Sequence, residues 1–154
     1  MAKRDRKKKS AVAAEAWREI FDFIVATGGH RNAVLARLGL TPNDSRALAS
    51  LDARTGRTMR ELARQWECDA STATWIVDRL ETKGLAERHA HETDRRVKLV
   101  VLTERGESTK AEMITGTYAP PPELMTLTDS QLVVLRDAAA PLRDAVRREP
   151  SRKP

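Results

Sequence analysis

The chain of 154 residues has one cysteine, a 4% share of aromatic residues and no long uncharged apolar run. A lone Cys68 excludes an internal disulfide framework and a multi-cysteine zinc site, and it fits a reducing compartment. No stretch approaches the roughly 18 apolar residues of a membrane span. The charged N-terminus is not followed by an apolar signal region. We therefore expect a cytoplasmic protein with no membrane partner.

The positive charge of the chain is concentrated at one end. The formal net charge is +6, and residues 1–9 hold four Lys and two Arg against one Asp, so almost all of the excess lies there. Runs of this kind are commonly solvated, and we expect residues 1–10 to form a disordered basic arm. Nucleic-acid binding by the rest of the chain must then depend on where particular arginines lie.

Few glycines and many Ala, Leu, Arg and Glu favour helices, and the length suits a single domain over residues 11–154. Apolar residues recur at helical spacing from Trp17 to Leu38, with a bend or break expected at Gly28-Gly29. A second helix should begin after Thr41, the predicted N-cap, with Pro42 at its first position.

Two short amphipathic helices follow with only residues 67–69 between them. The first begins with a Thr58–Glu61 capping box and has apolar residues at positions 59, 62, 63 and 66. The second has its apolar stripe at Ala73, Val77 and Leu80 and ends at Lys83-Gly84. Two such helices joined by a tight polar turn predict a helix-turn-helix unit.

A change of period after residue 85 predicts a β-hairpin. Residues 86–89 and 97–101 read as strands around a polar turn at about residues 91–94. A helix should then run from Thr103 to the prolines at 120–122, and another from a capping box at Thr128 to about residue 148, kinked at Pro141. We thus expect a mainly α winged helix-turn-helix fold in which the hairpin is the wing.

If the apolar stripe of the second short helix faces the core, the opposite face turns outward. That face would carry Ser71, Thr72, Trp75 and Arg79, with Thr74 at its boundary. Small hydroxyls at a helix N-terminus suit the major groove of DNA, and an arginine suits phosphate. The alternative is that the Ser, Thr and Asp residues only cap the helix and that Trp75 packs on a neighbour.

The hairpin turn places Arg95 and Arg96 beside Asp94, where an arginine on a ribbon suits the narrow minor groove. The alternative is a solvated basic turn. Arg60, in the first turn of the preceding helix, completes the predicted DNA-binding set. Because the basic wing directly follows the second short helix in the chain, one domain could contact both the major and the minor groove of DNA.

Four segments together resemble the signature of the MarR family. They are residues 70–85 (ASTATWIVDRLETKGL), Arg88, residues 94–96 (DRR) and residues 102–106 (LTERG). The resemblance covers about residues 58–106, and less specifically residues 15–148. Neither the glycine pair nor the lysine-rich N-terminus belongs to this pattern.

The resemblance implies a DNA-binding lobe at about residues 41–104 and a homodimer whose helices at about 12–39 and 105–148 intertwine. Each protomer would place its recognition helix in the major groove and Arg96 in the minor groove, with Arg88 and Asp94 bracing the wing. Small aromatic ligands would bind between the two parts. Trp17 and Phe21 are candidate lining residues for that ligand, and the alternative is that they form the dimer core.

No phosphate-binding loop, nucleophile motif or paired carboxylates occur, so we expect no enzyme activity and no cofactor. His89 and His91 share a strand face, but too few further ligands lie nearby to predict a metal site.

We predict a sequence-specific dimeric transcriptional regulator, acting as a repressor on a pseudo-palindromic operator. The alternative is a winged-helix scaffold for protein interaction or non-specific nucleic-acid association driven by the basic N-terminus.

Overall fold

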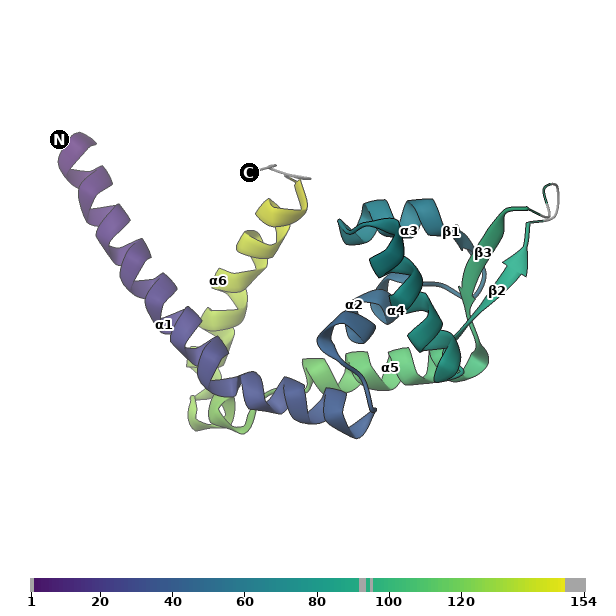
Figure 1. Ribbon diagram of the computed structural model, residues 1–154. Helices are drawn as coiled ribbons and strands as arrows, with labels where there is room; N and C mark the ends of the chain where they lie inside the picture. The colour runs from purple at the N-terminus through teal and green to yellow at the C-terminus, as the bar shows by residue number, and fades with distance from the viewer. Residues whose placement is uncertain (1, 92–93, 95, 149–154) are drawn as a thin grey trace. The chain divides into compact units, whose positions relative to one another are not determined.

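The computed structural model describes residues 2–91, 94 and 96–148, and it confirms a mainly helical fold with a small antiparallel sheet (Figure 1). The chain divides into two compact units, one ending at Ala119 and the other beginning at Pro120, where the sequence suggested a single domain. Its elements, in chain order, are α1 Ala2–Arg37, α2 Pro42–Ser50, β1 Arg57–Thr58, α3 Met59–Trp66, α4 Ala70–Thr82, β2 Ala86–Ala90, β3 Lys98–Leu102, α5 Glu104–Tyr118, the 3-10 helix η1 Pro122–Thr126 and α6 Asp129–Arg148.

Helix α1 begins at Ala2, so residues 2–10 are helical in the structure, whereas the sequence suggested a disordered arm. Alanine, lysine and arginine all favour helix, and no glycine or proline interrupts the run before Gly28. The helix continues through Gly28-Gly29, and it bends along its length (Figure 1). A Cβ at either glycine would meet nothing within 4 Å, so no close packing requires them.

The helix starts expected from the sequence are confirmed. Thr58 and Glu61 form a reciprocal capping box at α3, and Thr128 and Gln131 exchange the same pair of hydrogen bonds at α6. At α2, Thr41 is the N-cap, and the Asp44 side chain completes a capping box that the sequence had not specified. These residues satisfy backbone N–H groups that have no partner within the helix.

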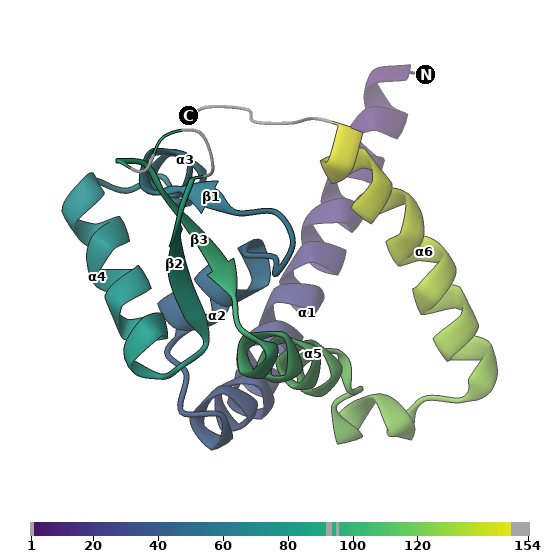
Figure 2. The same ribbon diagram turned by 90° about the vertical axis from the view of Figure 1, so that its right-hand side faces the viewer.

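The wing hairpin is confirmed as β2 and β3, which pair antiparallel from Ala86↔Leu102 to Ala90↔Lys98. A third strand, β1, was not predicted because two residues are too short to show a period, and it pairs Arg57 with Val100. The sheet order is therefore β1-β3-β2, with β3 in the centre (Figure 2). The buried side chains of the sheet are Ala86, Val100 and Leu102, while Leu99 and Val101 of β3 are only half-buried.

The core of the first unit lies between the C-terminal end of α1, helices α2 to α5 and the sheet. It is built from aliphatic residues with one buried tryptophan, Trp66, whose indole N–H donates to the Ser50 hydroxyl at 2.9 Å. The most deeply buried side chains are Leu48, Leu51, Leu62, Ala73, Val77, Leu80 and Val100. Burial of the α4 stripe at three of these positions fixes which face of that helix meets solvent.

The second unit contains η1 and α6. The prolines at 120–122 end α5 as expected, and the short η1 turn that follows was not anticipated. Pro141 lies inside α6, which continues past it. Several apolar side chains of α6 are exposed within the unit, namely Val133, Val134, Leu135, Leu142 and Val146. None of the described helices combines the length and apolar character that crossing a membrane requires.

Gly106 in the first turn of α5 is sterically required, in contrast to Gly28. A Cβ at position 106 would lie 1.9 Å from the Leu85 carbonyl oxygen, a backbone atom that cannot move independently. We expect Gly106→Ala to lower the free energy of unfolding by about 2 kcal/mol or more. Gly28→Ala should raise it by about 0.5–1 kcal/mol, because alanine favours helix. Urea unfolding measures both, and equal stabilities of the two variants would contradict this packing.

Candidate nucleic-acid interface

Helices α3 and α4 form the helix-turn-helix expected from the sequence. They are joined by residues 67–69, where Glu67 adopts a left-handed conformation with φ of 53° and ends α3. Leu62 and Trp66 of α3 and Ile76 of α4 are buried, in addition to the predicted α4 stripe. The turn and the shared core therefore hold α4 with a defined outer face.

The structure brings the predicted α4 residues together on that outer face. Ser71 and Thr74 are exposed, Thr72 and Arg79 are half-buried, and the Trp75 side chain is 52% exposed. We name these five residues the α4 outer face. Arg60 is exposed in the first turn of α3.

The hydroxyl groups of the α4 outer face all donate hydrogen bonds within the protein. Ser71 and Thr72 donate to the carboxylate of Asp69, the N-cap of α4, with Thr72 Oγ1 at 3.0 Å from Oδ2. Thr74 Oγ1 donates to the Ala70 carbonyl oxygen at 2.8 Å. The oxygen lone pairs that remain are acceptors, so this end of α4 carries hydroxyls ready to accept hydrogen bonds.

Asp69 carries its negative charge at neutral pH. Hydrogen bonds from the Ser71 hydroxyl and from the backbone N–H and hydroxyl of Thr72 lower the pKa of Asp69 to about 2. The carboxylate thus occupies the positive N-terminal end of α4, where a negative charge is stabilised by the helix dipole. Asp69, placed in the turn from the sequence, is thus the N-cap of α4, and capping by an Asp was part of the alternative interpretation of this helix start.

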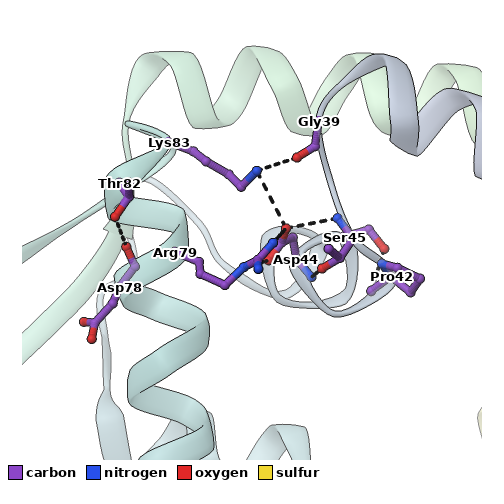
Figure 3. A network of polar contacts seen from close by, with 9 residues as sticks. Gly39, Pro42, Asp44, Ser45, Asp78, Arg79, Thr82 and Lys83 are labelled. Carbon is purple, nitrogen blue, oxygen red and sulfur yellow. Dashed lines mark hydrogen bonds and ion pairs between the residues drawn. The ribbon is translucent and has the colours of Figure 1, made fainter.

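Arg79 makes a contact that the sequence did not reveal. Its Nε and Nη2 atoms donate to the two carboxylate oxygens of Asp44 at 3.1 and 2.9 Å, which joins α4 to α2 (Figure 3). Asp44 is fully buried, and Arg79 retains 32% side-chain exposure. Lys83, the C-cap of α4, donates to the Gly39 carbonyl oxygen and lies 4.0 Å from Asp44 Oδ2.

The charge of Asp44 is compensated by its surroundings. Burial raises the pKa of Asp44, but hydrogen bonds from Arg79 and from the Thr41 backbone N–H and hydroxyl outweigh burial and hold it below its usual value. A buried carboxylate with two charged partners and a capping interaction is a strong constraint on the helices that carry these groups. The position of α4 on α2 is therefore tied to this one side chain.

The Trp75 ring lies over the Arg79 guanidinium, with Cζ 4.7 Å from the ring centroid. This geometry is a cation–π contact. Trp75 therefore packs on a neighbour, as the alternative interpretation held, and half of its surface still faces solvent.

The base of the wing is fixed by Arg88 on β2. Its guanidinium contacts Asp78 Oδ1 at 2.7 Å and also Glu81, so it ties the wing to α4. Near the wing tip, Asp94 Oδ1 accepts a hydrogen bond from the backbone N–H of Arg96 at 3.0 Å, and the Arg96 side chain is exposed. Arg95 lies outside the described residues.

Trp17 and Phe21, the candidate ligand residues, lie one helical turn apart on α1 with ring centroids 6.1 Å apart. Their side chains are 62% and 51% exposed, and Ile20 and Ile24 are exposed beside them. They form part of an apolar helix face in this single chain.

His89 contacts Glu87 at 2.8 Å on the wing. Within residues 2–91, 94 and 96–148, no group of three or more His, Cys, Asp or Glu side chains is arranged to hold a metal ion.

Comparison with known proteins agrees with this geometry. Residues 38–97 match the model of the MarR family. Over 85 residues the chain is 34% identical to the HTH-type transcriptional repressor MdtR of Bacillus subtilis (strain 168), and this match covers 55% of each protein. The chain thus spans about half the length of this curated relative.

Solved structures extend the likeness beyond the matched segment. The crystal structure of YusO from Bacillus subtilis is 25% identical, with a TM-score of 0.75 over 88% of this chain and 97% of that one. The structure of the S. aureus MepR–DNA complex has a TM-score of 0.62 over 80% of this chain and 98% of that one, and at 20% identity it supports the fold alone. The family model over residues 38–97, the curated relative and the solved structures all indicate a similarity to the MarR family, and the chain shares the winged helix-turn-helix fold of these structures.

Proposed function

We propose that this protein is a DNA-binding transcriptional repressor that acts as a homodimer on a pseudo-palindromic operator. The observation that carries the proposal is the α4 outer face, which presents hydroxyl groups and an exposed tryptophan immediately before a wing with an exposed arginine. Relatives support it, since MdtR is named a repressor and MepR was solved with DNA.

The chemistry of the α4 outer face favours contacts to bases over contacts to phosphate. The hydroxyl groups of Ser71, Thr72 and Thr74 donate hydrogen bonds within the protein, so their oxygen atoms are available to DNA only as acceptors. In the major groove the matching donors are the amino groups of adenine and cytosine. The carboxylate of Asp69 beside them repels phosphate, which supports base contacts at this end of the helix.

Basic residues at the two sides of α4 would hold the DNA backbone. Exposed Arg96 at the wing suits the minor groove, as does its sequence neighbour Arg95, and exposed Arg60 on α3 suits a phosphate. Arg88 would keep the wing at a fixed distance from α4 through its contacts with Asp78 and Glu81.

The dimer is proposed from apolar surface that a single chain leaves uncovered. Helix α1 exposes Ile20, Phe21 and Ile24, and α6 exposes apolar residues in its own unit. Contiguous apolar surface of this kind marks interaction sites, and a second copy of the chain is the occupant we propose. The helices around residues 12–39 and 105–148 would then be the dimerisation elements, and a small aromatic ligand near Trp17 and Phe21 would release the DNA.

The first test is binding to an operator obtained by selection from genomic DNA fragments. Thr72→Ala and Arg96→Ala should each weaken operator binding about tenfold at fixed salt, since a good base contact contributes about 1–3 kcal/mol. Thr82→Ala is the matched control, because it also removes a threonine hydroxyl from α4, one that donates to the Asp78 carbonyl oxygen at the other end of the helix. Fluorescence anisotropy measures the affinities, and half-sites should lie about one DNA turn apart.

The same assay separates the proposal from non-specific association through the basic N-terminus. Removing residues 1–9 should leave the preference for the operator over a scrambled duplex intact. If the N-terminus carries the binding instead, the slope of log affinity against log salt should collapse, since each phosphate contact contributes about 0.9. Loss of the operator preference in the truncated protein would refute the proposed reading surface.

The hydrogen-bonding role of Asp69 predicts its titration. Because the folded-state pKa is lowered to about 2 from 3.8, the stability that this carboxylate contributes is fully present above pH 4 and is lost as the pH falls toward 2. Carbon-detected NMR of the Asp69 carboxyl group should show the low midpoint, together with a matching shift of the Thr72 amide. A midpoint near 3.8 would mean that the Ser71 and Thr72 hydroxyls are free to donate elsewhere.

A further inference from the structure

A continuous series of contacts leads from the buried core of the first unit to its solvent surface. It begins at Asp44 on α2, which is fully buried, and passes through the guanidinium of Arg79 to the half-exposed ring of Trp75. Figure 3 shows the inner part of this series, where Arg79 and Lys83 converge on Asp44.

Each contact in the series restricts the next. Asp44 is itself held because the Thr41 backbone N–H donates to its Oδ2 atom at 3.0 Å. The two hydrogen bonds from Arg79 to separate carboxylate oxygens fix the plane of the guanidinium, as a single contact would not. The Trp75 ring lies over that plane, so the orientation of an exposed side chain is set by a residue that solvent does not reach.

The same contacts change the role expected for Arg79. The sequence suggested a phosphate contact, but two of its N–H groups are engaged by a carboxylate that compensates its charge. Trp75, by contrast, has half of its surface free. Of the two residues, Trp75 is therefore the one presented for contact.

We propose that Asp44 is a positioning residue for DNA recognition, which acts through Arg79 to fix the Trp75 ring for contact with DNA, while Arg79 serves as the support of that ring. This inference rests on the proposed function and adds a residue that makes no DNA contact itself. It predicts that changes at Asp44 alter the sequence preference of the protein through Trp75.

The first experiment needs no DNA. The three tryptophans are replaced by 5-fluorotryptophan, and the Trp75 signal in the fluorine NMR spectrum is assigned by its loss in Trp75→Phe. In Asp44→Asn this signal should move toward its position in the unfolded protein. It should stay in place in Glu112→Gln, the matched control, which removes a carboxylate paired with an arginine between two other helices. An unmoved Trp75 signal in Asp44→Asn overturns the inference whatever the DNA results.

The second experiment is a mutant cycle on operator affinity at fixed salt, with a scrambled duplex as reference. Trp75→Ala should weaken operator binding, and the loss should be about fourfold smaller in the Asp44→Asn background, as expected for coupled residues. In the Arg79→Ala background, the effects of Asp44→Asn and Trp75→Ala on operator affinity should become independent of each other. Independent effects of Asp44→Asn and Trp75→Ala in the presence of Arg79 contradict the proposal.

Two further variants cover other outcomes. If Asp44→Asn does not fold by circular dichroism, Arg79→Lys gives the same test, because lysine keeps the charge but has no plane to support the ring. Arg79→Ala should leave the slope of log affinity against log salt concentration unchanged. A decrease of about 0.9 in the magnitude of this slope would assign Arg79 to a phosphate contact instead. A wild-type protein without operator preference overturns the proposed function and the DNA role of Trp75 together, while the NMR result on ring positioning is decided separately.

Discussion

The ion pair between buried Asp44 and Arg79 is the interaction on which the geometry of the proposed DNA-binding face depends. A carboxylate removed from water is strongly unfavourable unless charged donors surround it, so the groups that satisfy Asp44 must stay where they are. They come from the start of α2 and from two turns of α4. The ion pair thereby holds α4 at one position against α2, and together with the buried apolar stripe it defines the outer face of α4.

A second carboxylate controls the other end of the same helix. Asp69 caps α4 and accepts hydrogen bonds from the Ser71 and Thr72 hydroxyls. It keeps its negative charge because these donors lower its pKa. The two acids thus act on opposite halves of one helix, Asp69 by fixing which hydrogen-bonding atoms are offered and Asp44 by fixing where an aromatic ring lies. In the proposed function neither acid contacts DNA, yet both determine which groups α4 presents.

The sequence predicted those parts of the fold that depend on local chemistry. The N-caps at Thr41, Thr58 and Thr128, the apolar stripe of α4 and the hairpin all follow from neighbouring residues and were found as expected. The two-residue strand β1 was missed, because its pairing with β3 joins residues more than forty positions apart. For the same reason, the burial of Asp44 and its pairing with Arg79, 35 positions away, leave no trace in either local segment.

DNA contact by the α4 outer face is tested by NMR mapping of the chain during titration with the selected operator. We expect amide shifts and intensity losses to concentrate on residues 70–79 and on the wing around Arg96. Residues 1–9 would then change little beyond the effect of salt. Changes confined to residues 1–9, with α4 unaffected, would contradict the central claim that the α4 outer face reads the DNA.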